Sequence, residues 1–415
     1  MEAQHLIDEI NADFYGRFQY PPPPATFERV VQSGFARKML AQDIGYWRSE
    51  ILPDAPRVWV AGCGTNQAVV TALKFPEAQV IGSDLSSPSL DRAAETARQL
   101  GLRNLELRRE SINEASYSSE FDLVISTGVI HHNADPEAAL RRLGAAMKPG
   151  GILELMVYNK FHRILTTAFQ GALRILAGTE TRPSWQDEMD LARLLATSFR
   201  HGNFMSAFLS QNAQLPDALF ADSLLQPVEY SYTVSSLRQL AAACRLELLT
   251  FCIDPFSRST GAVNWNLNFQ EPVLRERYQQ LGDLERWEIT NLLLGEASPM
   301  IWFYLQSVDS PRIRKSERDI CDEFLRAKFC RTATEKEIFS RAMDGAYSSV
   351  PKRAPFPGKP KPGSEAARVY AALEEGAELS RTLDRLGIEQ SFPQVQSLRL
   401  ELATSAYPFL QACGD

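Results

Sequence analysis

The sequence lacks the features of a membrane, secreted, metal-binding or general nucleic-acid-binding protein. No apolar run among its 415 residues is long enough to cross a bilayer, and Met1 to Gln19 is too polar for a signal peptide. The six cysteines contain no CxxC pair and no metal-like grouping with the five histidines. The net charge of −7 lacks the basic excess of a nucleic-acid binder. We therefore expect a cytoplasmic protein with reduced cysteines, no metal, and neither a membrane nor a nucleic acid as partner.

The stretch from Arg57 to Ser86 has the pattern of a strand, a turn, a helix and a second strand. The apolar strand runs into Gly62-Cys63-Gly64-Thr65, a helical pattern follows from Gln67 to Phe75, and the second strand ends on Asp84. The glycines allow a tight turn and close approach of a ligand, and the helix points free N–H groups into the same crevice. A carboxylate at the tip of the second strand can accept two ribose hydroxyls. The unit therefore predicts a nucleoside site.

Two absences narrow the choice of nucleoside. A dinucleotide site usually has GxGxxG, but the run Gly62-Cys63-Gly64-Thr65-Asn66-Gln67 has no third glycine. The turn also has no Walker lysine, so it is a poor cradle for phosphates. A nicotinamide-dependent oxidoreductase is therefore the weakest alternative.

Further segments extend the pattern. Phe121 to His132, FDLVISTGVIHH, reads as a fourth strand and its loop, and Asn133 to Gly151 reads as a helix and a Pro-Gly-Gly turn before a fifth strand. Together with the VAGCGT turn, residues 57–160 resemble the class I S-adenosylmethionine-dependent methyltransferases. The runs VAGCGTNQ, DLSSPSL and GVIHHNADP resemble a bacterial branch of small-molecule methyltransferases with large inserts. The resemblance implies a doubly wound, Rossmann-like α/β fold with a seven-stranded sheet, and S-adenosylmethionine as the cofactor.

The resemblance also implies where the cofactor is held. The glycine turn would hold its methionine end and Asp84 its ribose. Asn66 stands where this family often has a third glycine. Asparagine tolerates left-handed backbone better than most residues, so Asn66 is compatible with the turn. Where the family usually has an acid for the adenine amine, the sequence has Ser111 preceded by Glu110. The expected cofactor residues are Gly62, Cys63, Gly64, Thr65, Gln67, Asp84, Leu85, Ser89, Ser111, Ile112, Thr127, Gly128 and His132.

Methyl transfer from a sulfonium is an in-line displacement, so the enzyme must align the acceptor and, where needed, remove its proton. His131 and Tyr158 are the catalytic candidates, with His131 facing the substrate and His132 packing under the cofactor. Tyr158 either orients an acceptor or caps the pocket. A buried Glu229 would need a partner, and the substrate is one candidate. The expected substrate residues are Tyr20, His162, Arg163, Glu229 and Tyr232.

A chain of this length and 44% hydrophobic content can bury more than one core. We expect helices over 1–20, 26–51 and 310–343 and two insertions in the sheet, which either roof a closed pocket or form a homodimer surface. The expected parts are an N-terminal helical segment covering the cofactor site (1–52), the methyltransferase domain (53–309) with substrate-capping insertions at 160–232 and 254–299, a helical extension (310–350), a Pro-rich linker (351–363) and a small helical accessory domain (364–415).

The sequence therefore predicts a methyltransferase that acts on an O, N or C atom of a small-molecule acceptor, with specialised metabolism as one setting. Methylation of RNA, protein or a carrier-bound substrate would favour an NPPY-like tetrapeptide where Thr127-Gly128-Val129-Ile130 stands. A non-catalytic nucleoside-binding regulator would be expected to have a degraded turn, whereas both glycines and Asp84 are present. Residues 310–363 carry 13 Lys and Arg against seven Asp and Glu, which is either a solvated face or a docking site for an acidic partner.

Overall fold

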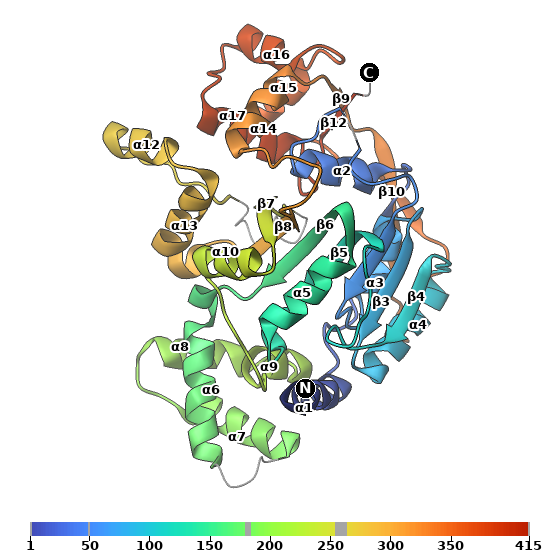
Figure 1. Cartoon of the computed structure of the whole chain (residues 1–415), viewed down its shortest axis with the longest axis vertical. Helices are drawn as coiled ribbons and strands as arrows, with labels where there is room; N and C mark the ends of the chain where they lie inside the picture. The colour runs from blue at the N-terminus through green and yellow to red at the C-terminus, as the bar shows by residue number, and fades with distance from the viewer. Residues whose placement is uncertain (1, 49, 179–183, 254–263, 414–415) are drawn as a thin grey trace.

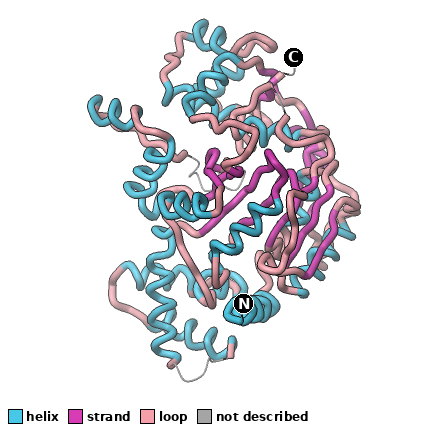
Figure 2. The backbone as a smooth tube through the Cα atoms, in the orientation of Figure 1, coloured by secondary structure: helices cyan, strands magenta, loops and turns pink. Residues whose placement is uncertain are grey.

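The computed structural model describes residues 2–48, 50–178, 184–253 and 264–413. A seven-stranded sheet in the order β4-β3-β2-β5-β6-β8-β7 lies at its centre (Figure 2). Only β8 runs antiparallel to its neighbours in this sheet. The strands are β2 (Arg57–Ala61), β3 (Gln79–Asp84), β4 (Leu105–Arg109), β5 (Phe121–Thr127), β6 (Met147–Val157), β7 (Leu246–Phe251) and β8 (Ile301–Ser307). The predicted doubly wound, seven-stranded fold is confirmed.

Both faces of this sheet are covered by helices, so its central strands are apolar on both sides. Val58 and Val60 of β2 pack with α2 (Phe35–Asp43), α3 (Gln67–Lys74) and α4 (Ser87–Gln99). Trp59 and Ala61 alternate to the other face, where they share a core with α5 (Pro136–Ala146), α10 (Val234–Ala243) and α13 (Asp283–Leu294). The order of the strands reverses between β2 and β5, which places the ligand crevice at the carboxyl ends of these strands.

The first insertion forms a helical layer beyond the carboxyl ends of the strands. It contains η2 (Lys160–Arg163), α6 (Ile164–Ala177), α7 (Trp185–Ser198), α8 (Phe204–Asn212) and α9 (Asp217–Leu224). Phe14 and Phe18, from α1 (Glu2–Arg17) and the residue next to it, belong to the same hydrophobic core as these helices. Figure 1 shows α1 beside α9 at the end of the molecule opposite the C-terminus. We refer to α1 and α6–α9 together as the roof.

The second insertion packs elsewhere. Its described part contains α12 (Pro272–Gln279), α13 and η3 (Gly295–Ala297), while 254–263 lie outside the described residues. Trp265 and Trp287 pack against Phe303 of β8, with ring centroids 5.5 and 5.3 Å away. The aromatic side chains of this insertion therefore extend the core of the sheet.

The predicted helices at 26–51 and 310–343 are wrong in part, because both segments contain strands. β1 (Thr26–Val30) pairs with β10 (Thr334–Ser340), and β10 pairs with β11 (Lys352–Phe356). Phe27 and Phe339 are buried against Val69 and Leu73 of α3. The predicted Pro-rich linker therefore begins with a strand, and its Pro355 is tolerated because β11 is an edge strand.

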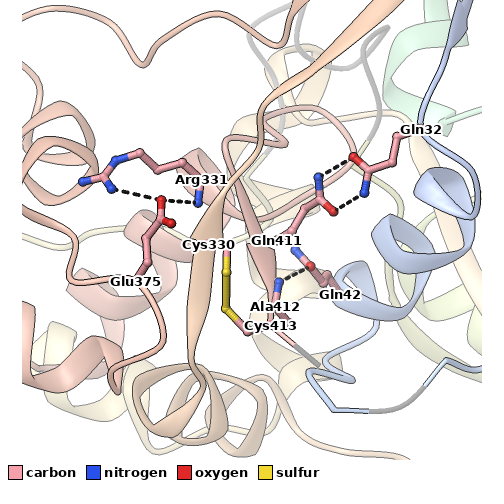
Figure 3. Close-up of a disulfide and its surroundings, with 8 residues drawn as sticks. All are labelled: Gln32, Gln42, Cys330, Arg331, Glu375, Gln411, Ala412 and Cys413. Carbon is pink, nitrogen blue, oxygen red and sulfur yellow. Dashed lines mark hydrogen bonds and ion pairs between the residues drawn. A yellow bond between two sulfur atoms is a disulfide. The ribbon is translucent and has the colours of Figure 1, made fainter. Parts of the chain in front are cut away.

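The remaining C-terminal elements form a helical cluster against α2. They are α14 (Glu317–Arg326), β9 (Phe329–Arg331), α15 (Glu365–Ala372), α16 (Leu379–Leu386), α17 (Phe392–Leu402) and β12 (Leu410–Ala412). Gln42 of α2 is fully buried there, donates to the carbonyls of Ala403 and Leu410, and accepts from the N–H of Ala412. β12 pairs with β9, and a disulfide joins Cys330 of β9 to Cys413, the residue after β12 (Figure 3). The prediction of six reduced cysteines is therefore wrong for this pair.

Within the described residues, no helix has both the length and the apolar character needed to cross a membrane.

Candidate active site

A cavity of about 960 Å³ opens at the carboxyl ends of β2 to β6. Its floor comes from the glycine turn after β2, the end of β3 and the loops after β4 and β5, and one wall comes from the roof and from Tyr20 and Pro21. The cavity is also lined by residues of β1, α2, α3, β8, β10 and β11. This volume lies at the upper end of the range of roughly 300–1,000 Å³ that is usual for small-molecule and cofactor pockets. The cavity can therefore hold a cofactor together with a second small ligand.

The glycine turn has the backbone conformation that glycine favours. Gly62 and Gly64 lie at φ of 73° and 51°, in the left-handed region. A Cβ on Gly62 would come within 2.5 Å of Val129, and one on Gly64 within 2.9 Å of the carbonyl oxygen of Tyr20. Both positions therefore exclude a side chain.

Asp84 holds this turn in place. One carboxylate oxygen accepts the N–H of Gly64 at 2.8 Å, and the other accepts the N–H of Ser86 at 2.8 Å. Burial raises the pKa of Asp84, while the bonds from the backbone N–H groups of Ser86 and Gly64 lower it. Each carboxylate oxygen keeps further acceptor capacity, because it has more than one lone pair.

Asn66, which stands in the place of the missing third glycine, has a role of its own. It lies at φ −131°, outside the left-handed region, so its tolerance of that region is not needed. Its amide donates to the carbonyl of Pro22 at 3.1 Å, and the Thr65 hydroxyl donates to that of Pro21 at 2.5 Å. The proline segment is thereby tied across the glycine turn.

The loop after β4 meets a carboxylate from the roof. The Ser111 hydroxyl donates to Asp8 of α1 at 2.6 Å, and both residues line the cavity. The N–H of Asn113 donates to the Ser111 hydroxyl at 3.1 Å. The acid that sequence analysis did not find after the third predicted strand is thus present beside Ser111, but it comes from a distant helix.

Of the two histidines after β5, His131 does not face the cavity as expected, whereas His132 lies on the cavity wall. The short helix η1 (Ile130–His132) turns His131 inward, where it is fully buried with its ring centroid 3.8 Å from that of Tyr158. His132 lines the cavity, and its Nδ1 lies 2.8 Å from the carbonyl oxygen of Val228. Burial lowers the pKa of His131, and it lowers that of His132 to about 4. Both rings are therefore neutral at pH 7, and His132 rather than His131 lies on the cavity wall.

Glu229 has a partner within the chain. The Nε and Nη2 atoms of Arg163 donate to its two oxygens at 2.7 and 2.6 Å, and Gln170 donates to it at 3.2 Å. The guanidinium group of Arg163 also lies 4.3 Å from the ring centroid of Tyr158. The substrate is therefore not required to balance Glu229, which does not itself line the cavity.

The remaining expected residues divide between the cavity and its surroundings. Tyr20, Tyr158 and Arg163 line the cavity, whereas His162 contacts the carbonyl of Ser298 and Tyr232 packs in the core of the sheet. Thr65 is buried behind the turn. The other twelve expected cofactor residues, Gly62, Cys63, Gly64, Gln67, Asp84, Leu85, Ser89, Ser111, Ile112, Thr127, Gly128 and His132, all line the cavity.

Sequence analysis missed five polar residues that the roof brings to this cavity. They are Asp8, Asn11, Tyr15, Asp222 and Ser223. Asn11 donates to the carbonyl of His132 at 2.9 Å, which joins α1 to the loop after β5. The period-four spacing of Leu6, Ile10, Phe14 and Phe18 predicts the helix, but it does not show which polar face meets the cavity. Among the described residues, no group of three or more His, Cys, Asp or Glu side chains is arranged to hold a metal.

The comparisons with known proteins agree with this geometry. A family profile described as a methyltransferase domain matches residues 59–153. An uncharacterized protein of a Synechococcus strain is 28% identical over 60% of this chain and 60% of its own length. The trans-aconitate 2-methyltransferase of Deinococcus radiodurans is 35% identical over 32% of this chain and 50% of its own length. The tRNA 5-carboxymethoxyuridine methyltransferase of Escherichia coli is 35% identical over 29% of this chain and 47% of its own length.

The chain thus spans about half to three-fifths of the length of these curated relatives. A solved structure, that of PKMT2 from Rickettsia typhi, covers 94% of this chain and 76% of its own with a TM-score of 0.57 at 14% identity, a likeness of fold alone. A second structure of that protein is a complex with AdoHcy. The family match, the fold and the glycine turn with Asp84 agree, and the chain therefore carries a class I, S-adenosylmethionine-dependent methyltransferase domain.

Proposed function

We propose that this protein is an S-adenosylmethionine-dependent methyltransferase whose acceptor is a small molecule bound beneath the roof. The observation that carries the proposal is the glycine turn braced by Asp84, which opens into a cavity that α1 and the first insertion cover on one side. The names of the relatives give no single acceptor, because they include a tRNA and a small-molecule methyltransferase. The acceptor class is therefore argued from the site.

The residues present fit the cofactor. The space beside Gly62 and Gly64 that a Cβ would occupy leaves room for its methionine end, and Asp84 can accept the two ribose hydroxyls. Ser111 and Asp8 lie where the adenine would be recognised. The bound cofactor would supply a methyl group activated by an adjacent sulfonium.

The chain's own contribution is to orient the acceptor and exclude water. Two hydrogen bonds hold α1 in position. Asn11 of α1 donates to the backbone after β5, and Trp185 of α7 donates to Asp13 of α1. An enclosed wall of this kind favours a small acceptor, because a folded macromolecule would have to displace α1 to reach the cavity. Tyr158 and Arg163 follow β6 on the same wall and are placed to position the acceptor.

Calorimetry with S-adenosylmethionine and with its demethylated product tests the cofactor assignment. Asp84→Asn replaces the charged acceptor of the two ribose hydroxyls. Losing these charge-assisted hydrogen bonds should cost about 2 to 4 kcal/mol of binding free energy, so the variant should bind the cofactor roughly thirty-fold or more weakly. Asp91→Asn, on the exposed surface of α4, is the matched control. Unchanged affinity of Asp84→Asn would contradict the assignment.

Mass spectrometry tests the acceptor class. The protein and cofactor are incubated with a small-molecule extract and, separately, with the macromolecular fraction of a cell lysate. We expect a metabolite to gain the mass of one methylene. Transfer of label from methyl-labelled cofactor to protein or RNA alone would overturn the small-molecule acceptor and leave the cofactor assignment intact.

A further inference from the structure

The roof places an acidic side chain that has no counter-charge in the part of the cavity beneath it. Asp222 of α9 is buried, with 9% of its surface exposed, and lines the cavity. Its Oδ1 accepts one hydrogen bond, from Gln226 at 3.0 Å. Among the ion pairs of the described residues, Asp222 takes part in none. A buried carboxylate that forms no ion pair is stable only when it is protonated or when a cation binds next to it.

The nearest basic residue is already neutralised. Arg163 donates to the carbonyl of Ser223, the neighbour of Asp222, at 3.1 Å, but its charge is balanced by its ion pair with Glu229. The group formed by Arg163, Glu229 and Asp222 therefore has one net negative charge when Asp222 is ionised. A bound cation would bring this group to neutrality.

Three tyrosines line the same part of the cavity. Gln226 donates to the phenol oxygen of Tyr15 at 2.8 Å and to Asp222, so these two oxygens share one amide nitrogen. Tyr20 and Tyr158 line the cavity too, and both interact electrostatically with Asp222. Aromatic rings attract cations through their negative faces, and phenol oxygens accept hydrogen bonds from them.

The whole cavity is acidic. Its charged lining residues are six acids, Asp8, Glu28, Asp84, Glu110, Glu154 and Asp222, against three bases, Lys74, Arg163 and Lys336. This balance disfavours an anionic acceptor, which would meet a like charge at Asp222.

We propose that the acceptor is an amine that enters as its ammonium ion and is held by Asp222 among Tyr15, Tyr20 and Tyr158. The inference rests on the proposed methyltransferase function. Asp222 takes one proton from the ammonium group and becomes a carboxylic acid. The nitrogen lone pair then forms the new N–C bond while the methyl–sulfur bond breaks, and the electron pair of that bond stays on sulfur. The product leaves as a methylated ammonium ion, and Asp222 returns its proton to solvent.

Binding of matched probes to the complex with the demethylated cofactor tests the proposal. The probes are benzylamine, benzyl alcohol and benzoate, which share a ring and differ in charge at pH 7.5. We expect benzylamine to bind at least about tenfold more tightly than either of the others, because only it can form a charge-assisted hydrogen bond with Asp222. Equal or tighter binding of benzoate would overturn the proposal.

Two variants of α9 separate Asp222 from general effects on the roof. Asp222→Asn keeps the size of the side chain and should lose the preference for benzylamine. Asp217→Asn alters an exposed carboxylate of the same helix and should keep it. Both should retain the wild-type affinity for the demethylated cofactor, whose loss would instead count against the proposed function. An unchanged preference in Asp222→Asn would refute the role of this carboxylate.

A turnover assay with pooled acceptors provides a second measurement. The wild-type protein and S-adenosylmethionine are given a pool of primary and secondary amines, a pool of carboxylates and a pool of alcohols. We expect a methylene mass gain in the amine pool and its loss in Asp222→Asn. Products formed only in the carboxylate or alcohol pool would contradict the amine acceptor and would leave the methyltransferase function standing.

Discussion

Arg163 and Glu229 form a two-point ion pair in which only 14% of the Arg163 side chain and 2% of the Glu229 side chain are exposed. The pair joins the start of the first insertion to the segment that returns from it to the sheet. It therefore fixes both ends of the first insertion at the same place, next to Tyr158.

Breaking this pair from one side should destabilise the protein. Glu229→Ala leaves a buried guanidinium without its partner, which costs about 3 to 5 kcal/mol, whereas replacing both residues with methionine should recover part of the loss. Denaturant unfolding of the two variants measures the difference. A loss below about 1 kcal/mol for Glu229→Ala would show that solvent reaches the pair.

Gly64→Ala should weaken cofactor binding as well as the fold. The new Cβ would lie 2.9 Å from the carbonyl oxygen of Tyr20 and would also require a left-handed backbone at φ 51°. Gly101→Ala is the matched control, because Gly101 also has a positive φ of 66° but has nothing within 4 Å of its Cβ position. The left-handed backbone should cost both variants about 1 to 2 kcal/mol of stability, and Gly64→Ala should lose more because of its contact with the Tyr20 carbonyl. Only Gly64→Ala should lose cofactor affinity, by about tenfold or more. Equal affinities in calorimetry would contradict this.

The rate of methylation of an amine should depend on the ionisation of Asp222. Burial raises its pKa to about 7, with Arg163 lowering the pKa and Glu229 raising it. The other titratable groups that face it, the phenols of Tyr15, Tyr20 and Tyr158, have pKa values raised by burial and stay neutral at this pH. The value of kcat/KM should therefore rise with pH up to about 7. Asp222→Asn should lose this rise, and a profile that is the same in both proteins would exclude Asp222 as the proton acceptor.

Asp43 should make the free energy of unfolding fall as pH rises, whereas an acid in a salt bridge makes it rise. It is buried against the C-terminal cluster, where it accepts hydrogen bonds from the N–H and hydroxyl of Ser405 and from Tyr304. Burial raises its pKa to about 7, while the bonds from Ser405 and the charges of Lys74 and Arg399 lower it.

The folded protein therefore holds this proton more tightly than the unfolded chain, whose aspartates titrate near about 4. Asp43 contributes stability at low pH that is lost as pH rises from about 4 through 7. Denaturant unfolding at pH 5 and pH 8 should show a smaller difference for Asp43→Asn than for the wild type. The exposed Asp91→Asn should not reduce the difference, and an equal reduction in both would count against Asp43.

The disulfide between Cys330 and Cys413 should stabilise the C-terminal cluster. The two cysteines are 83 positions apart in the sequence. Removing a disulfide that closes a loop of this length typically costs a protein about 2 to 4 kcal/mol of stability. The double variant Cys330→Ser/Cys413→Ser should therefore unfold at lower denaturant concentration. Cys244→Ser, at a half-buried free thiol, is the control. Wild-type protein that shows no change on reduction would contradict the prediction.

The signals that predict the glycine turn and Asp84 are local. The strand before Gly62, the helix after it and Asp84 lie within one short segment, so their spacing predicts the contact between Gly64 and Asp84. Tyr20, Tyr158 and Arg163 were predicted as well and line the cavity, but the polar residues of α1 and α9 could not be found in this way. Asp222 and Tyr15 are joined by Gln226, yet they lie on helices about two hundred positions apart, and neither helix has a motif that marks a polar site.

The small sheet was missed for a related reason. The only apolar residues of β10 are the adjacent Ile338 and Phe339, so its sequence lacks the alternation of a half-buried strand, and its partner β1 lies more than three hundred residues earlier. The prolines after residue 350 favoured a linker. An edge strand tolerates proline, however, because it forms hydrogen bonds with a neighbour on one side only. Pairing between distant segments leaves no periodic signal in either of them.

The contacts of Gln42 have a consequence for the synthesis of the protein. The helix that contains it packs against the sheet, but its buried amide finds its partners in Ala403, Leu410 and Ala412. A ribosome that adds roughly 5 to 20 residues per second needs on the order of 20 to 70 seconds to translate the intervening stretch. During that interval α2 and the adjoining strand β1 lack their final neighbours, so the nascent chain would benefit from a chaperone that shields them until translation of this region is finished.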